Sequence, residues 1–192
     1  MHRFTFAFAA LAITMLAACG VVPMEAKLAP VVAVNSIDVG HGRIIGVVVT
    51  DERPNHDLGD RSPAGGHIKM NQDLVAIYQT TVFDGLRRKG FAPVIGPGPE
   101  TILRIEIRSL SYKASMGLVK GNVSVDSTAK AYVTFRGKPL YEHFYRSGEN
   151  THPMVVPGAG NSNAKLNGAL SATIEQLLED PDLLRELAAS SF

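Results

Sequence analysis

Apolar residues recur with helical spacing in the segment 71–89. The side chains that share one face, at about 100° per residue, are Leu74, Val75, Tyr78, Val82 and Leu86. Asn71 stands where an N-cap is expected, and Gly90 stands where a left-handed residue commonly ends a helix. The segment is therefore predicted to be an amphipathic helix that buries one face.

A second helical pattern occupies the C-terminal part of the chain, after a loop at 157–163. Its apolar stripe consists of Leu166, Leu170, Ile174, Leu177 and Leu178. The pair Asp180-Pro181 resembles an N-cap followed by proline at the first helical position. A short further helix is therefore predicted over 181–189.

Strand patterns fill most of the remaining chain. Residues 101–112 and 122–135 alternate apolar and polar positions, which is typical of half-buried strands. A turn then leads to a partner strand at 139–147, so these three strands are predicted to form an antiparallel meander. The run at 44–49 lacks polar alternation, which favours a strand covered on both faces.

The order of these elements predicts an α+β fold. We expect a two-layer sandwich, in which a mainly antiparallel sheet carries two amphipathic helices on one face and polar side chains with some tyrosines on the other. Residues 91–95 begin a further strand, 51–67 read as a polar loop, and the pattern leaves open whether 31–35 joins the sheet. Residues 31–192 are predicted to be a single domain.

The N-terminus has the pattern of a secretory signal. Arg3 supplies a positive start, and residues 4–18 are apolar except for two threonines. As a helix this run would extend roughly 22 Å, which is short of a hydrocarbon core of about 30 Å. Residues 1–18 are therefore predicted to be a signal peptide rather than a permanent membrane span.

The sequence LAAC at 16–19 resembles the bacterial lipobox. The resemblance implies cleavage between Ala18 and Cys19, a thioether-linked diacylglycerol on Cys19, and acylation of the new N-terminus. The alternative is an ordinary signal peptide with an unrelated cysteine. Gly20 stands where aspartate would favour inner-membrane retention, so we expect the outer membrane, on its periplasmic side. Residues 19–30 contain two prolines and no clear period, and are expected to be a lipidated tether.

Composition excludes several classes of function. Apolar residues make up 45% of the chain, enough for a packed core, and the formal net charge is +1. Without Arg3 the mature part has 18 basic and 18 acidic residues. Such a neutral chain gives no reason to expect binding to nucleic acid or electrostatic attraction to lipid. One cysteine cannot form an internal disulfide and excludes a multi-cysteine zinc site.

Candidate chemistry gathers in the polar loop at 51–67. The side chains that could serve as ligands or proton carriers there are Asp51, Glu52, His56, Asp57, Asp60 and His67. Their spacing matches no known ligand pattern, so we expect no metal and no cofactor. We expect Asp51 and Arg53 to pair with each other or to cap nearby backbone groups. The chain has no nucleophile elbow, phosphate loop or dinucleotide fingerprint, and we predict no catalytic residue.

Aromatic side chains cluster in the predicted meander. Tyr132, His143 and Tyr145 are the candidate residues of a contact surface. The alternative is that some of these rings fill the core or a sheet edge.

Several short motifs occur in the order and spacing of the YajG family of lipoproteins. They are the lipobox, VTDERP at 49–54, KGF at 89–91, LRIEIRSLSY at 103–112, KGNVSV at 120–125 and the helix at 161–178. The chain resembles this family over roughly residues 28–187. The resemblance implies an outer-membrane or periplasmic lipoprotein without a defined biochemical role, and it supplies no catalytic residues.

Two functions remain in view. The first is a non-enzymatic binding or envelope-assembly module, which the lipid on Cys19 would anchor and which would contact an envelope protein through the open sheet face or an edge strand. The second is an envelope enzyme acting on peptidoglycan or a small metabolite, which would need convergent groups such as His56, Asp57 and His67. The missing catalytic motifs favour the first.

Overall fold

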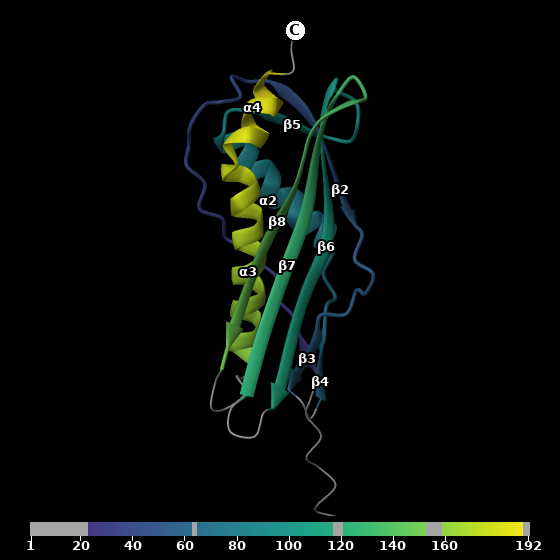
Figure 1. Cartoon of the computed structure of the whole chain (residues 1–192), viewed down its shortest axis with the longest axis vertical. Coiled ribbons are helices and arrows are strands. Elements are labelled where there is room, and N and C mark those ends of the chain that lie inside the picture. Colours follow the sequence, from purple (N-terminus) through teal and green to yellow (C-terminus); the bar gives the residue numbers. More distant parts are fainter. Residues whose placement is uncertain (1–22, 63–64, 117–120, 153–158, 190–192) are drawn as a thin grey trace, which may run out of the picture.

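A mixed eight-stranded sheet with helices on one side forms the described part of the chain (Figure 1). The computed structural model describes residues 23–62, 65–116, 121–152 and 159–189. Its strands are β1 (Met24–Glu25), β2 (Ile44–Asp51), β3 (Gly59–Ser62), β4 (Gly65–Lys69), β5 (Ala92–Ile95), β6 (Thr101–Met116), β7 (Gly121–Phe135) and β8 (Lys138–Thr151). Within these ranges the helices are α2 (Leu74–Arg88), α3 (Ala159–Glu179) and α4 (Pro181–Ala189).

The long strand β6 organises the sheet. One edge of β6 pairs with β7 along its whole length, and β7 pairs in turn with β8, so the predicted antiparallel meander is confirmed. The other edge of β6 is shared by two parallel partners, β2 on its first half and β3 on its second half. Strand β2 also pairs in parallel with β5, and β4 links β1 to β3.

The prediction of a mainly antiparallel two-layer sandwich is therefore not confirmed. Four of the seven strand pairings are parallel, which makes the fold a mixed α/β arrangement with three helices among the described residues. Parallel neighbours need a crossover between them, and α2 provides it between β2 and β5. The sequence pattern identified β2, β5, β6, β7 and β8, but not β1, β3 and β4, and it carried no information about which edge of β6 a strand would join.

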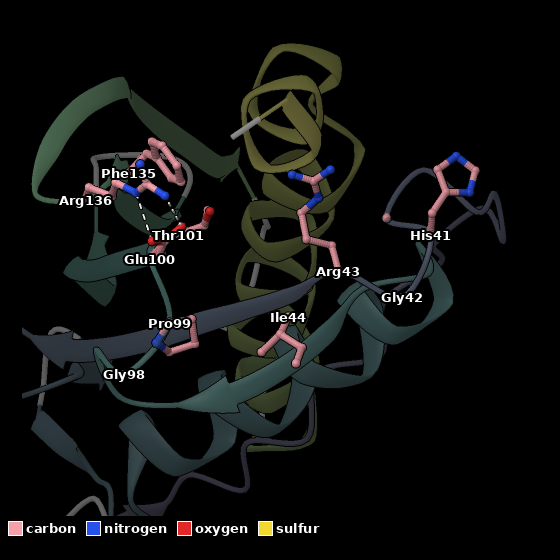
Figure 2. A pocket seen from close by; sticks show the side chains of 11 residues that line it. His41, Gly42, Arg43, Ile44, Gly98, Pro99, Glu100, Thr101, Phe135 and Arg136 are labelled. Carbon is pink, nitrogen blue, oxygen red and sulfur yellow. Dashed lines mark hydrogen bonds and ion pairs between the residues drawn. The ribbon is translucent and has the colours of Figure 1, made fainter. Parts of the chain in front are cut away.

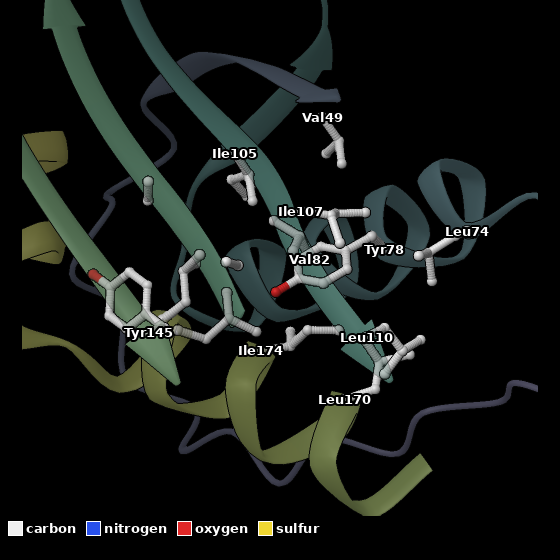
Figure 3. Close-up of a cluster of buried hydrophobic side chains, with 14 of the residues drawn as sticks. Val49, Leu74, Tyr78, Val82, Ile105, Ile107, Leu110, Tyr145, Leu170 and Ile174 are labelled. Atoms are coloured by element: carbon white, nitrogen blue, oxygen red, sulfur yellow. The ribbon is translucent and has the colours of Figure 1, made fainter. Parts of the chain in front are cut away.

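The core lies between the sheet and the helices. Strand β7 alternates buried and half-buried residues over almost its entire length, and its buried side faces α3. Figure 3 shows Tyr78 of α2 and Ile174 of α3 meeting Ile107 of β6 in this layer. Where α2 meets α3, a Cβ on Gly85 would lie 2.2 Å from Cδ1 of Leu178, so a larger residue there would force the Leu178 side chain to move.

The helix boundaries follow local capping chemistry. Asp73, not the predicted Asn71, caps α2 by accepting the N–H of Ala76, while the Asn71 amide donates to Glu25. Gly90 has the expected left-handed conformation, with φ of +81°. The predicted cap of the last helix is confirmed, because the Asp180 carboxylate accepts the N–H groups of the first turn of α4.

Residues 26–35, which we call the strap, lie along α3 and not in a free tether. Their backbone N–H groups donate to side chains on α3 that are four residues apart for the first three bonds and eight residues apart for the last. These bonds join Lys27 to Asn163 (3.1 Å), Ala29 to Asn167 (2.7 Å), Val31 to Ser171 (3.0 Å) and Asn35 to Glu179 (2.7 Å). Two extended residues and four helical residues advance by similar lengths, about 6.6 and 6.0 Å, which explains the matching repeat.

The expectation of a tether over 19–30 is thus wrong for its described part from residue 24 onward. Strand β1 pairs with β4, and the next residue, Ala26, donates to the carbonyl of Lys69. The segment 31–35 does not join the sheet and forms the second half of the strap.

The predicted loop at 51–67 also contains structure. Strands β3 and β4 form an antiparallel pair there, and Gly59 starts β3 with φ of +99°. A Cβ on Gly59 would lie 2.1 Å from the carbonyl oxygen of Tyr112, so glycine is required for β3 to approach β6.

Candidate binding surface and polar sites

The sheet face opposite the helices is left uncovered by the described elements along β6, β7 and β8 (Figure 1). We call its central part the open face. Its charged and aromatic side chains are Arg104, Glu106, Arg108, Lys130, Tyr132, Glu142, Phe144 and Arg146. Strand alternation places them together, because the residues between them point toward the helix side of the sheet.

Lys130 is the centre of this surface. Its ammonium lies 2.5 Å from Glu142 of β8, and it stands over the rings of Tyr132 (4.5 Å) and Phe144 (4.9 Å). The hydrogen bond to Glu142 and the contact with Tyr132 raise the pKa of Lys130. The ammonium therefore stays charged at neutral pH and links β7 to β8 on this face.

The acidic residues of the open face have hydrogen-bond or ion-pair partners, but two of its cations lack a carboxylate partner among the described residues. Glu106 accepts the Tyr132 hydroxyl at 3.1 Å and lies 3.3 Å from Arg108. Arg146 stacks on Phe144 at 5.4 Å, and neither it nor the exposed Arg104 has a carboxylate partner within the described ranges. The open face therefore carries four cations and two anions and offers free guanidinium groups to an acidic ligand.

The predicted contact residues do not form one surface. Tyr132 lies on the open face, whereas His143 and Tyr145 point toward the helix side of β8. Tyr145 is only 4% exposed, and its hydroxyl donates to Asp180 at 2.6 Å, so it is a packing residue. Phe144 takes the place of Tyr145 on this surface, because strand alternation puts it on the same face as Tyr132 and it is 42% exposed.

Asp180 joins the end of α3 to β8. Burial opposes ionisation of its carboxyl, but hydrogen bonds from the Tyr141 and Tyr145 hydroxyls and from the first N–H groups of α4 outweigh burial and lower the pKa of Asp180. Burial and the neighbouring carboxylate raise the pKa of Tyr141 to about 12 and the pKa of Tyr145 further. These groups are fixed in one protonation state at neutral pH, which suits a structural role.

The predicted pairing of Asp51 with Arg53 is confirmed. Arg53 is 4% exposed, and two of its nitrogens donate to the two oxygens of Asp51 at 2.8 Å each. Burial opposes ionisation of Asp51, but the hydrogen bonds and charge of Arg53 outweigh it and lower the pKa of Asp51. His56 lies 3.2 Å from the same carboxylate, so this pair closes the turn after β2.

His67 meets two other residues of the predicted polar loop. Its ring nitrogens lie 3.4 Å from Asp57 and 3.4 Å from Asp60. All three side chains are more than two fifths exposed. In the part of the chain that the structure describes, no group of three or more histidine, cysteine, aspartate or glutamate side chains is arranged to hold a metal ion.

A polar depression of about 800 Å³ lies where the start of β2, the start of β6 and the β7–β8 turn meet. Figure 2 shows Glu100, Arg136 and Phe135 on one side of it and Arg43 on the other, with His41 farther out. Glu100 and Arg136 are paired at 2.9 Å, whereas Arg43 has no partner among the described residues. The depression could receive a small acidic group, but no acid and base converge in it.

The predicted lipidation residue Cys19 and the cleavage position at Ala18 lie outside the described residues. Of the helices that the structure describes, none is both long and apolar enough to cross a membrane.

The comparison with family models identifies a lipoprotein family. A family model described as "uncharacterized lipoprotein" matches residues 30–187. No curated protein matches the chain. Among solved structures, protein XCC0632 from Xanthomonas campestris is similar with a TM-score of 0.55 at 11% identity, covering 88% of this chain and 99% of that one. A minor lipoprotein from Acinetobacter baumannii has a TM-score of 0.50 at 10% identity, covering 74% and 94%. Such low identities relate the folds alone.

Proposed function

This chain belongs to the family described as uncharacterized lipoproteins, and on that premise we propose that it is a lipid-anchored, non-enzymatic module that binds an envelope protein through the open face. The narrower resemblance to YajG lipoproteins and the lipobox ending at Cys19 support placement on the periplasmic side of the outer membrane. The observation that carries the proposal is the uncovered charged and aromatic face of β6, β7 and β8.

The short link between anchor and domain supports this role. From Cys19 to Met24, where β1 begins, an extended chain spans at most about 17 Å. Strand β1 lies at the same end of the molecule as β3 and β4 (Figure 1). With lipid on Cys19, this end would stay near the bilayer, and the long axis of the sheet would lift the open face toward the periplasm.

The chemistry of the open face indicates an acidic protein partner. Arg104 and Arg146 lack carboxylate partners within the described ranges, and Phe144 and Tyr132 offer flat rings beside them. Aromatic residues and arginine are the types enriched where proteins bind each other. A partner that supplies carboxylates and covers the Phe144 ring would satisfy both features.

The test is site-specific photocrosslinking in intact cells. A benzophenone amino acid placed at Thr128, on the open face, should yield one dominant adduct with another protein, and the same probe at the exposed Gln176 of α3 should not. Arg104→Glu should abolish the adduct, while Lys69→Glu, the same charge reversal on exposed β4, should leave it. An adduct unaffected by Arg104→Glu, or one with twice the mass of this chain, would refute a foreign acidic partner at this face.

The meeting of His67 with Asp57 and Asp60 supports a second candidate function, that of an envelope enzyme. An imidazole between two carboxylates could move a proton, although all three groups are largely exposed. If this cluster acts in catalysis, His67→Gln and Asp57→Asn should each remove a cellular phenotype while the thermal unfolding temperature stays unchanged. A phenotype that survives both changes removes the enzyme from consideration.

A further inference from the structure

Strand β8 is a long edge strand whose outer side is unpaired. It runs from Lys138 to Thr151 and pairs only with β7. Apart from that ladder, no hydrogen bond between described residues involves the β8 backbone. Proteins usually protect such edges with proline, bulges or cover. Here Pro139 and a register shift opposite Val133 and Thr134 protect only the first part of the strand.

We propose that a second copy of this chain pairs with β8 as an antiparallel strand, around a two-fold axis that passes between the two copies of Phe144. The resulting sheet would continue from one copy into the other, with the helices of both on the same side. This inference rests on the free backbone edge of β8 and shares Glu142, Phe144 and Arg146 with the open face. Arg104 lies on β6, away from this edge, so Arg104→Glu tests the foreign partner without touching the proposed strand pairing.

The side chains of β8 are complementary to themselves in this register. An axis at Phe144 places residues whose numbers sum to 288 opposite each other. Glu142, whose carboxylate also contacts Lys130 of its own copy, then faces Arg146 of the second copy, and the same pair recurs on the other side of the axis. Between these two ion pairs the Phe144 rings, each 42% exposed, meet on the axis. Opposite charges and aromatic rings at directly opposed positions stabilise antiparallel strands.

Neighbouring registers are less favourable. When the helices of both copies lie on one side of the sheet, two residues that face each other must both have even numbers or both have odd numbers. The axis can therefore pass through any residue of the strand, but not between two residues. Axes at His143 and Tyr145 oppose Phe144 to Glu142 and to Arg146 respectively, and form no pair of opposite charges. An axis at Glu142 opposes Glu142 to itself and Lys138 to Arg146, and an axis at Arg146 opposes Arg146 to itself. Like charges directly opposite destabilise a pair of strands. The register at Phe144 is the one that opposes Glu142 to Arg146 twice.

The space beside β8 can receive the second copy. A hollow of about 410 Å³ lies between β8 and α3, lined by Ser147, Gly148, Glu149, Ala164, Lys165, Gly168 and Ala169. A Cβ on Gly168 would meet no atom within 4 Å. Small residues therefore face the free edge from α3, and the helix layer does not exclude a neighbouring strand. On the helix side, the exposed His143 would face Tyr145 of the second copy.

Cysteine crosslinking tests the register directly. The periplasm is oxidising, and a residue on the axis meets its own copy at a Cα distance of about 4.5–5.5 Å, which suits a disulfide. Full-length Phe144→Cys should therefore form a disulfide-linked dimer in cells. Glu142→Cys or Arg146→Cys alone should not, because each lies about 14 Å from its own copy. Co-expressed Glu142→Cys and Arg146→Cys chains should crosslink to each other. The unsubstituted chain is the control for Cys19.

A second measurement does not need cysteine. The unsubstituted lipoprotein in detergent should have the mass of a dimer by light scattering. Arg146→Glu should shift it to a monomer, and adding Glu142→Arg should restore the dimer. A monomeric unsubstituted protein together with no Phe144→Cys crosslink overturns the proposal. Crosslinking of Glu142→Cys alone as strong as that of Phe144→Cys overturns the register. Phe144 and Arg146 are exposed enough that neither change should unfold the chain.

Discussion

Replacing Glu179 by alanine should destabilise the protein through the lysine that it leaves behind. Lys89 follows α2 and is 2% exposed, and its ammonium donates to Glu179 at 2.7 Å. The other Glu179 oxygen accepts the N–H of Asn35 at 2.7 Å, so one carboxylate joins the end of α2, the end of α3 and the strap. Glu179→Ala would leave a buried ammonium without its counter-ion.

The magnitude follows from this burial. Removing one partner of a buried ion pair costs about 3–5 kcal/mol. Because the Glu179 side chain is 29% exposed and water could enter after its removal, we expect the lower end, about 3 kcal/mol. With a urea m-value of about 2 kcal/mol/M, the unfolding midpoint should fall by about 1.5 M. The measurement is urea unfolding of the mature protein, followed by circular dichroism.

The controls separate charge burial from lost contact. Lys89→Met leaves a partly exposed carboxylate that still accepts the Asn35 N–H, so it should cost only about 1 kcal/mol. The double variant Lys89→Met/Glu179→Leu should recover most of the stability, since no charge is then stranded. Gln176→Ala, an exposed change on the same helix, should be neutral. Two results would contradict this explanation. One is a loss of unfolding free energy below about 1 kcal/mol for Glu179→Ala, and the other is a loss for Lys89→Met that exceeds the loss for Glu179→Ala.

The same carboxylate predicts a pH dependence. Burial opposes ionisation of Glu179, but hydrogen bonds from Lys89 and Asn35 outweigh burial and lower its pKa. A carboxyl group with a lowered folded-state pKa contributes stability that is present above its unfolded pKa of about 4.3 and is lost as pH falls through the folded value. The effect of Glu179→Ala should therefore shrink below about pH 4.

Four further outcomes are expected. Tyr78→Phe should raise stability by about 1 kcal/mol in thermal unfolding, because the Tyr78 hydroxyl is fully buried and has no hydrogen-bond partner in the described part of the chain. Asn167→Ala should cost about 2 kcal/mol by removing bonds to the strap, whereas Asn161→Ala on exposed α3 surface should be neutral, as urea midpoints will show. Unfolding temperatures should fall with pH below about 4, in part because the lowered pKa of Asp180 makes its protonation unfavourable to the folded state. Gly85→Ala should cost about 1–3 kcal/mol by forcing α2 and α3 apart, and a stability equal to the parent would show that the contact is softer than its geometry indicates.

Much of the local structure was predictable because its causes are local. The apolar stripe of α2, its glycine stop at Gly90 and the cap at Asp180 depend on residues within a few positions of each other. The alternation in β6 and β7 predicted which residues face the core. The pairing of Asp51 with Arg53 also lies within one turn, and the structure contains it.

The candidate surface was predictable only in part. Tyr132 was identified from its place on the polar side of a strand, and it lies on the open face. Tyr145 follows the alternative that some of these rings fill the core, because it is 4% exposed. Applied to β8, the period of two separates Phe144 from Tyr145, and the register with β7 then brings Phe144 beside Lys130.

The sequence alone determined the helices, the meander, the lone cysteine and its lipobox resemblance, since each depends on residues that are close together in the chain. Only the tertiary structure decided that β2 and β3 share one edge of β6 in parallel and that the strap lies on the polar side chains of α3. These contacts join residues far apart in the chain, such as Ala29 and Asn167. Backbone hydrogen bonds and extended segments carry no side-chain signature of their partner, so periodicity could show which elements form but not which ones meet.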